Sequence, residues 1–322
     1  MKKLILHEVH HRAGAILGEH EGWEAPLHYG DWEREYRALK EGVGVSDLSF
    51  RGMLRVRGSD RTSFLHNMLT NDIKALSPGK GCYAALLTDR AKMVSDMFVF
   101  AFEDSYLLDI EPGTLEKARQ FIEKYIIADD VTIEDETLAT GHICFQGPGA
   151  EPLHGKNMGS VPLLNGYHMV CSAQSLEKAW ADLVNSGAVP VGLEALEALR
   201  IEAGIPRFGT DMDDTVLIME AGLTHAISFT KGCYLGQEIV ARVTTHGRLT
   251  RKLFRLTLSG KNPLKTGEKI YKNSEEAGYI TSSAFSPGLG KVVALGYVKT
   301  EYAEPGTSLG VAGREAVVSP LP

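Results

Sequence analysis

The spacing of hydrophobic residues predicts one clear helix among the first fifty residues. It runs from Asp31 to Gly42, because Trp32, Tyr36 and Leu39 fall on one face of a helical wheel. Asp31 can act as its N-cap, and Gly42 is a typical residue for ending a helix. The residues from 44 to 50 then predict a turn that leads into a strand.

The next stretch, residues 53–140, alternates strand-like and helix-like patterns. The strands and helices expected from periodicity and turn residues are a strand from Met53, a helix capped near Ser59, a hairpin of 82–87 and 92–102, a strand at 106–110, a helix at 115–125 and a strand at 131–134. Mixed elements in this order predict an α+β domain.

The remaining pattern changes character near residue 253. Before that point the expected elements are a strand at 142–146, a loose polar stretch up to Asn165, a strand at 167–171, helices at 176–186 and 194–203, and a surface or cleft loop at 203–214. After it, short alternating strands predict a small all-β domain, at 253–258, 268–272, 278–283, 292–298 and 307–318.

Length and charge limit the classes of function. A chain of 322 residues exceeds the usual size of a single core, so two or three domains are expected. The net charge of -7 argues against direct nucleic-acid binding. No run of about 18 apolar residues predicts a membrane helix. Four cysteines without a C-x-x-C pair fit a reducing compartment, so the predicted location is cytoplasmic.

Two patterns resemble metal sites but are interpreted as accidental. His7, Glu8 and His11 spell H-E-x-x-H, a motif that needs a helix, and no helix is expected so near the start. The acidic loop around Asp211 lacks the glycine and the terminal glutamate of a calcium-binding EF-hand, so a solvated turn is expected there. No metal is therefore predicted.

The segment KGCYLGQEIVAR, residues 231–242, has the strongest chemical character. Cys233 lies two residues from Lys231, shortly before a helix expected to begin near Gly236. A neighbouring cation and a helix N-terminus both favour the thiolate, the reactive form of cysteine. A cysteine between glycines is, taken alone, more often a packing residue. Spacing leaves both interpretations open.

This segment closely resembles the signature of the YgfZ family of folate-binding proteins, which are relatives of the glycine cleavage T-protein. Three more stretches match the family: FLHNMLTNDIKAL, LLTDRAKMVSDMFVF, and RIEAGIPRFGTDM followed by MEAGL. The resemblance spans nearly the whole chain. It implies an α+β fold with three lobes around a central hole that holds tetrahydrofolate, and a barrel-like terminal β domain.

The implied domains are a central folate-binding α+β domain made of 1–52 and 141–245, a second α+β domain at 53–140, and a C-terminal β domain at 246–322.

The resemblance also implies roles for five binding residues. Glu202 would accept the N–H groups of the pterin ring. Lys231 and Arg242 would bind the anionic glutamate tail, and Tyr234 and Phe208 would stack on the rings. Each has an ordinary alternative as a surface charge or a core aromatic residue.

Asp96 is the implied catalytic carboxylate. T-proteins carry an Asp-Asp pair at the matching place, whereas this chain has Ser95 and Asp96. The missing acid puts aminomethyl transfer in doubt but leaves folate binding untouched. Asp96 could still orient water or a folate nitrogen.

The function predicted from these features is that of a tetrahydrofolate-binding protein that supports iron–sulfur cluster assembly or repair, and thereby tRNA modification, with Cys233 as its working thiol. Its expected partners are folate and iron–sulfur assembly proteins or iron–sulfur enzymes, because one cysteine cannot hold a cluster alone. The alternative is a folate-dependent aminomethyltransferase of the glycine cleavage system. Direct RNA binding ranks last because the chain is acidic.

Overall fold

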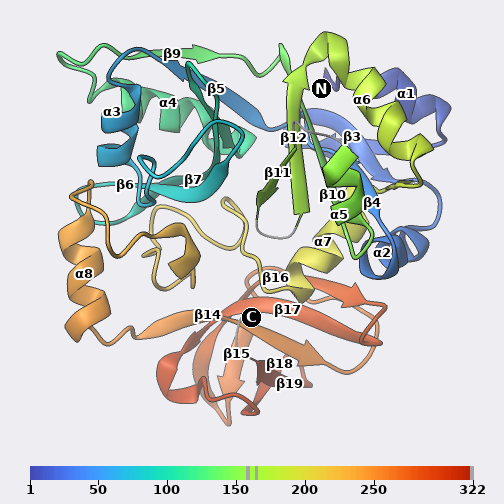
Figure 1. Ribbon diagram of the computed structural model, residues 1–322. Helices are drawn as coiled ribbons and strands as arrows, with labels where there is room; N and C mark the ends of the chain where they lie inside the picture. Colours follow the sequence, from blue (N-terminus) through green and yellow to red (C-terminus); the bar gives the residue numbers. More distant parts are fainter. Residues whose placement is uncertain (157–159, 164–165, 320–322) are drawn as a thin grey trace. The chain divides into compact units, whose positions relative to one another are not determined.

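The computed structural model describes residues 1–156, 160–163 and 166–319 (Figure 1). The chain divides into two compact units. The first unit comprises residues 1–87, 94–195 and 225–235, and the second comprises residues 88–93, 196–224 and 236–322.

The first unit begins with a small sheet and two helices. Its elements are β1 (Lys2–Lys3), α1 (His7–Arg12), β2 (Ile16–His20), β3 (Trp23–His28) and α2 (Trp32–Glu41), and the strand order is β1-β3-β2. The helix predicted at 31–42 is confirmed as α2. The side chain of Asp31 accepts a hydrogen bond from the backbone N–H of Arg34, and Tyr36 and Leu39 are buried. An aspartate cap and one apolar face are therefore enough to define this helix.

The first unit also contains a five-stranded sheet, called here the central sheet. It has the order β11-β12-β10-β4-β13, from β4 (Gly44–Asp47), β10 (Thr140–Gln146), β11 (Ser160–Leu163), β12 (Gly166–Ser172) and β13 (Val189–Pro190). The helices near it in sequence are α5 (Ala150–Lys156), α6 (Ala173–Asn185) and α7 (Leu193–Glu202). Trp180 and Leu183 of α6 pack on Ile143 and Phe145 of β10. This contact buries one face of the sheet.

A second five-stranded sheet, called here the outer sheet, has the order β6-β7-β8-β5-β9. Its elements are β5 (Gly52–Arg57), α3 (Arg61–Met68), β6 (Gly81–Leu87), β7 (Met93–Ala101), β8 (Tyr106–Ile110), η1 (Pro112–Thr114), α4 (Leu115–Glu123) and β9 (Thr132–Asp135). Met97 and Val99 of β7 face the core formed with α3 and α4. Phe100 faces the opposite way and packs with Val161 of the central sheet. The alternation of β7 thus separates a helix-covered face from a face toward the central sheet.

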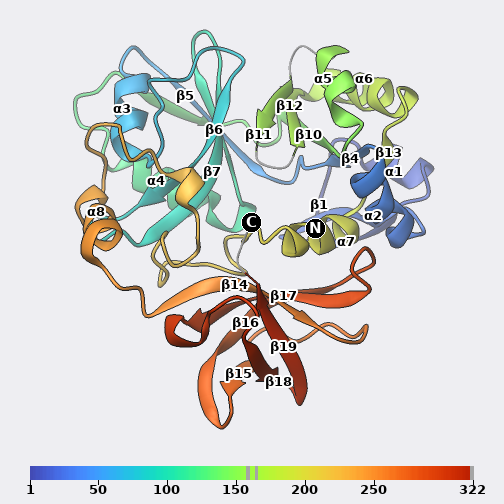
Figure 2. The ribbon, with the colours of Figure 1, turned by 60° about the horizontal axis from the view of Figure 1, so that its bottom comes forward.

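The second unit contains a closed six-stranded barrel, whose strands can be followed in Figure 2. Its elements are α8 (Gln237–His246), β14 (Arg251–Leu258), β15 (Lys269–Lys272), β16 (Glu275–Ser286), β17 (Lys291–Lys299), η3 (Thr300–Tyr302), β18 (Ser308–Val311) and β19 (Arg314–Ser319). The short helix η2 (Thr224–Ala226) lies where the chain passes from the second unit, which ends at Thr224, to the first, which resumes at His225. Ring closure leaves no open sheet edge. The predicted α+β class and terminal β domain are both confirmed, whereas the division into three domains stays a prediction.

Several short elements differ from the sequence predictions. The stretch expected to be loose and polar up to Asn165 contains α5 and β11, although residues 157–159 and 164–165 lie outside the described part of the chain. The segment with His7 and His11 is helical after all, as α1. Both helices are very short, so their stability comes from packing rather than from a repeating apolar stripe. Within the described ranges, no helix is long and apolar enough to cross a membrane.

Gly58 offers a test of the connection between β5 and α3. It has φ +109, and a Cβ there would lie 1.9 Å from the carbonyl oxygen of Asp130, whereas Gly22, with φ +83, has open space around it. We expect Gly58→Ala to lower the free energy of unfolding by roughly 3 kcal/mol or more. The matched Gly22→Ala should cost only about 1–2 kcal/mol, the backbone penalty alone.

Denaturant unfolding followed by tryptophan fluorescence measures this difference, because Trp23, Trp32 and Trp180 all lie in the first unit. Equal costs for the two variants would contradict the close approach of Gly58 to Asp130.

Candidate functional site

Lys231 of the KGC segment is buried, with 8% of its surface exposed, and its ammonium group binds the main chain. Nζ donates hydrogen bonds to the carbonyl oxygens of His66, Leu69 and Asn71, those to Leu69 and Asn71 at 2.7 and 2.9 Å. These carbonyls lie at the C-terminal end of α3, where helices leave carbonyl groups without partners. Burial lowers the pKa of Lys231 to about 8. Lys231 therefore holds the segment against α3.

Cys233 is exposed, two residues after this anchor. The backbone N–H of Leu235 donates to the carbonyl of Asn67 at 3.0 Å, so the segment is fixed on both sides of the cysteine. Gly236 follows with φ +83 and caps α8, as predicted. A Cβ on Gly236 would lie 2.6 Å from the carbonyl oxygen of Thr88, so only glycine fits there. Gly232 has open space around it and needs no such freedom.

The other two predicted residues of this segment lie in different settings. Tyr234 is buried, its ring centroid is 5.1 Å from Nζ of Lys231, and burial raises the pKa of its phenol to about 12. Arg242 is exposed on α8, where its guanidinium lies 3.0 Å from the carboxylate of Glu238 one turn earlier. The assignment of Lys231 and Arg242 to an anionic tail, and of Tyr234 to ring stacking, stays a prediction.

Asp96 lies on the same face of β7 as Phe100, and the two oxygen atoms of its carboxyl group have different surroundings. Oδ2 accepts a hydrogen bond from the hydroxyl group of Tyr83 on β6. Oδ1 is buried and has no hydrogen-bond partner within the described part of the chain. Burial, followed by the negative charge of Glu111, raises the pKa of Asp96 to about 6, although the Tyr83 hydrogen bond and Arg51 lower it. A buried carboxyl group with an unused oxygen is costly unless a ligand supplies the missing partner.

Ser95 points to the other face of the same strand. Its hydroxyl oxygen lies 2.9 Å from that of Thr114, at the start of α4. Because successive strand residues alternate faces, an acid at position 95 would not lie beside Asp96. Ser95 also donates to the backbone carbonyl of Asp96 at 3.0 Å, and its side chain lies on the opposite side of β7 from the Asp96 carboxyl group.

The remaining predicted residues belong to the second unit. The carboxylate of Glu202 accepts a hydrogen bond of 2.7 Å from the hydroxyl of Ser286, and its backbone carbonyl accepts one of 2.6 Å from Arg255. Phe208 is buried and forms a bridge with Met212. The predicted residues thus divide between the units, with Asp96, Lys231, Cys233 and Tyr234 in the first and Glu202, Phe208 and Arg242 in the second. Their binding roles stay predictions.

Asp211 differs from the solvated turn that was expected. It is 2% exposed, and its carboxylate accepts hydrogen bonds from Thr281 and Ser282 of β16. Arg200 also donates to it, at 2.5 Å. The prediction was wrong for this residue because its partners on β16 lie some 70 positions away in sequence and no local pattern reveals them. Asp213 and Asp214 are exposed, in keeping with a turn.

A cluster of buried charged groups beside Asp96 was not predicted. Arg51 donates to the carboxylates of Asp109 and Glu111. Nδ1 of His142 lies 2.9 Å from Asp109, and its Nε2 lies 2.9 Å from Nδ1 of His168. Burial alone would raise the pKa of Asp109, but the nearby Arg51 and His142 lower it below its usual value. The available signal was a charged residue inside an apolar strand, such as Asp109 in YLLDI.

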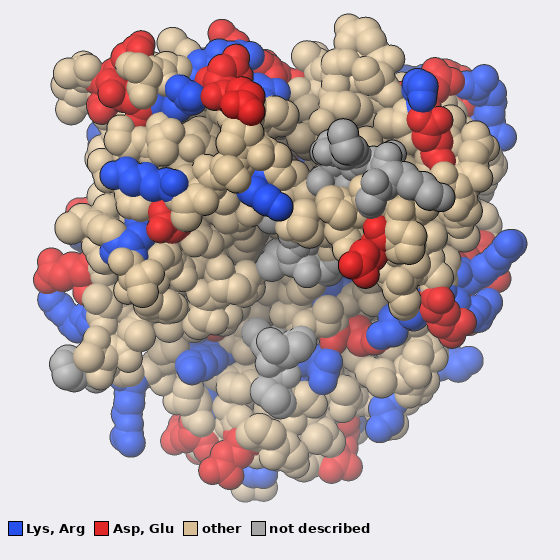
Figure 3. Space-filling model, viewed as in Figure 1, with Lys and Arg blue, Asp and Glu red and all other residues tan. Residues whose placement is uncertain are grey.

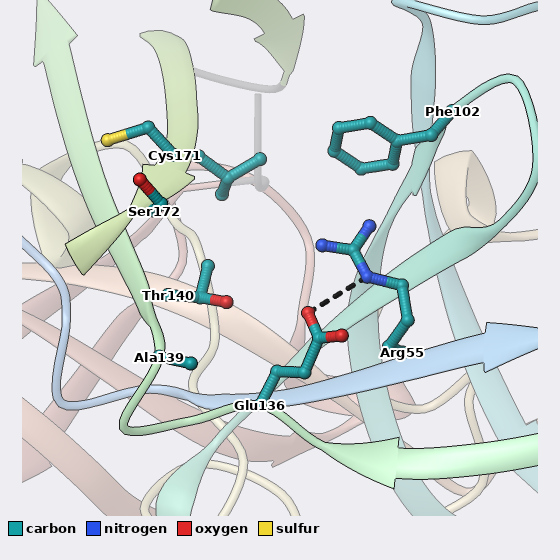
Figure 4. Close-up of a pocket in the computed structure, with 8 residues that line it drawn as sticks. Arg55, Phe102, Glu136, Ala139, Thr140, Cys171 and Ser172 are labelled. Carbon is teal, nitrogen blue, oxygen red and sulfur yellow. Dashed lines mark hydrogen bonds and ion pairs between the residues drawn. The ribbon is translucent and has the colours of Figure 1, made fainter. Parts of the chain in front are cut away.

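Cavities and metal sites do not provide a stronger candidate. A cavity of about 210 Å³ in the first unit is lined by Arg55, Phe102, Glu136 and Cys171 among others, and Figure 4 shows the Arg55–Glu136 ion pair on its wall. None of the predicted site residues lines it. Within the described residues no group of three or more His, Cys, Asp or Glu side chains could hold a metal. His7 of the H-E-x-x-H pattern instead lies 2.8 Å from Glu24.

Comparison with known proteins identifies the class of this fold. The model of the GCVT N-terminal domain matches residues 6–160 and 165–231, and the model of the glycine cleavage T-protein C-terminal barrel domain matches residues 251–321. The solved structure of glycine cleavage system aminomethyltransferase T from Bartonella henselae has the same fold, with a TM-score of 0.87 and 24% identity over 98% of this chain and 96% of that one.

Curated relatives give the same result. The aminomethyltransferase of Chloroherpeton thalassium is 32% identical over 94% of this chain and 92% of its own length. That of Thermotoga maritima is 30% identical over 97% of this chain and 93% of its own length. The chain therefore belongs to the glycine cleavage T-protein family.

Family membership decides part of the sequence predictions. The family binds tetrahydrofolate, so the predicted superfamily and cofactor are confirmed. These relatives are named aminomethyltransferase rather than YgfZ, and they lend no support to iron–sulfur partners or tRNA modification.

On the face shown in Figure 3, the described basic and acidic side chains are interspersed.

The structure predicts that Lys231 contributes to stability. Lys231→Met should lower the free energy of unfolding by about 2 kcal/mol, because three carbonyl groups near α3 would lose a charged donor. Lys74→Met, at an exposed position, should change it by less than about 0.5 kcal/mol. Urea unfolding measures both. If Lys231→Met matched the control, the ammonium group would not be acting as an anchor.

Proposed function

We propose that this protein is a tetrahydrofolate-dependent aminomethyltransferase, in which Asp96 accepts a proton and returns it during the transfer of the aminomethyl group. The observation that carries the proposal is the buried, unpartnered Oδ1 of Asp96 in a carboxyl group with a pKa near 6. The names of the curated relatives point the same way.

The residues around Asp96 fit an N–H group of a reduced folate. Oδ1 needs a donor, since Oδ2 is already occupied by Tyr83. When bound, tetrahydrofolate would supply the nitrogen that accepts the one-carbon unit. As a carboxylate, Asp96 can accept a hydrogen bond or a proton at Oδ1, and as an acid it can return that proton to a departing amine. A group that titrates near neutrality can do both.

Neighbouring side chains would keep Asp96 in place for this role. Tyr83 fixes Oδ2, and the ring of His225 stacks on Tyr83 with a centroid distance of 5.4 Å. Asn71 also donates a hydrogen bond to the backbone carbonyl of Tyr83, at 2.9 Å. The tyrosine is therefore held from two sides, which limits the positions open to the carboxyl group.

A second proposal is the iron–sulfur role, with Cys233 as its working thiol and YgfZ as the closer branch of the family. It is supported by the exposure of Cys233 between two anchored backbone positions, which leaves the sulfur accessible to a partner. It ranks second because the relatives carry the aminomethyltransferase name. The two roles use different side chains and can be tested separately.

The first proposal predicts that Asp96→Asn lowers the rate of methylenetetrahydrofolate formation from an aminomethyl-loaded carrier protein by about 10²–10⁴-fold, the usual range for a proton-transferring group. In the wild type, the rate should fall as pH drops below about 6, because the raised pKa leaves Asp96 protonated there. Rates measured by absorbance between pH 5 and 8 test both expectations.

The matched control is Asp104→Asn, on the exposed hairpin between β7 and β8, which should keep the wild-type rate. Tetrahydrofolate titrations of Asp96→Asn and of Glu202→Ala separate binding from chemistry. A wild-type protein that binds tetrahydrofolate but forms no product with any carrier protein would refute aminomethyl transfer.

The second proposal predicts that Cys233→Ser leaves tetrahydrofolate binding and aminomethyl transfer unchanged but lowers the activity of iron–sulfur enzymes in cells that depend on this protein. Cys82→Ser, which alters a half-buried cysteine, is the comparison. Normal iron–sulfur enzyme activity in cells with Cys233→Ser would exclude the thiol from that role.

A further inference from the structure

Three carboxyl groups lie near one guanidinium group in the outer sheet, and two of them bind it. Arg51 donates from Nε to Asp109 and from a terminal nitrogen to Glu111. Asp96 is the third acid, and no hydrogen bond joins it to Arg51 among the described contacts. All three acids are buried or nearly so, with side-chain exposures of 0% for Asp109 and 14% for Glu111 and a residue exposure of 6% for Asp96.

The register of the strands places Glu111 opposite Asp96. In the antiparallel pair of β7 and β8, Phe98 faces Asp109 and Met97 faces Ile110. Asp96 precedes Met97, and Glu111 is the first residue after β8, so extending this register by one residue brings the two acids to the same place at the end of the strand pair. Residues directly opposite each other in such a pair have Cβ atoms about 4.5–5.5 Å apart. Asp96, Phe98 and Phe100 share one face of β7, and Asp109 lies on the matching face of β8, two residues before Glu111.

We infer that Glu111, held by Arg51 beside the end of β7, is the positioning residue whose negative charge directs the transferred proton to Asp96. This inference rests on the proposed function of Asp96 and supplies its missing second acid. The T-protein pattern pairs Asp96 with an acid at position 95, but Ser95 faces the helix side of the sheet. The second carboxylate on the side of Asp96 comes from the neighbouring strand.

The charge balance explains why Asp96 takes the proton rather than its neighbours. Arg51 already donates hydrogen bonds to Asp109 and Glu111, which stabilise their charged forms. Asp109 also has His142 at 2.9 Å. Among the described contacts, the carboxyl group of Asp96 has only the neutral hydroxyl group of Tyr83 as a partner, so loss of its negative charge costs least. When one proton binds the cluster, it therefore goes to Asp96.

The other titratable groups around the cluster come from the outer sheet, the central sheet and the segment that carries His225. The outer sheet contributes Tyr83, whose pKa is raised well above its usual value by burial and by Asp96. The central sheet contributes His142 and His168, and burial lowers the pKa of His168 to about 3, so it stays neutral. Burial also lowers the pKa of His225. Arg51 is the permanent cation nearby, so Glu111 is the anion that opposes the charge of Asp96.

The test uses nuclear magnetic resonance of the whole protein with ¹³C-labelled aspartate, which follows the carboxyl carbon of Asp96 through a pH titration without substrate. Asp96→Asn assigns the signal. In Glu111→Gln, the titration midpoint of Asp96 should fall by about one pH unit, because a like charge has been removed without a change in side-chain size. The control Glu134→Gln removes an acid of the same sheet that pairs with exposed Arg57, and should leave the midpoint in place.

Glu111→Asp separates charge from packing. It keeps the negative charge, so its midpoint should lie above that of Glu111→Gln and close to the wild-type value. An unchanged midpoint in Glu111→Gln, or equal midpoints in the glutamine and aspartate variants, would overturn the inference.

The titration does not depend on catalysis, so the inference and the proposed function can fail separately. If transfer does occur, Glu111→Gln should shift the acid limb of the pH–rate profile by the same amount and in the same direction as the NMR midpoint. A shifted midpoint in a protein that shows no transfer would uphold the coupling of Asp96 to Glu111 and refute only the proposed reaction.

Discussion

The guanidinium group of Arg51 is the contact on which the proposed site depends. It lies just before β5 and joins two carboxylates, Asp109 and Glu111, at the end of β8. A buried cation without such partners would cost several kcal/mol, and so would the two acids without the cation. Their mutual neutralisation is therefore a condition for closing the outer sheet here, and it leaves the third acid, Asp96, without a direct counter-charge.

Lys231 shows the same physical rule in a different place. The sequence motif presents it as a charge next to a reactive cysteine, whereas the structure uses the charge to bind three carbonyl oxygens near the end of α3. A buried ammonium group must find acceptors, and a helix C-terminus offers them. What the motif achieves in the fold is a fixed loop with Cys233 on its outer side.

The family comparison and the strand geometry together change what the presence of Ser95, in place of an acid, implies about aminomethyl transfer. Ser95 seemed to argue against aminomethyl transfer, because it replaces one acid of a pair. In the structure Ser95 contacts Thr114 on the helix side of β7, while Asp96 faces the other way. A substitution on one face of a strand need not affect chemistry on the other. The loss of that acid is therefore compatible with the function suggested by the named relatives.

The sequence by itself determined the elements that have a local signature: α2 with its cap, the hairpin of β6 and β7, and most strands of the barrel. Local periodicity failed for α1, α5 and β11, which are too short to carry it. The resemblance of four motif segments, among them KGCYLGQEIVAR, identified the folate-binding family. Only the tertiary structure decided which charges are buried together, because Arg51 and Glu111 are 60 residues apart and Asp211 and Thr281 are 70 apart. Such pairs depend on strand register and chain crossing, which no short stretch of sequence encodes.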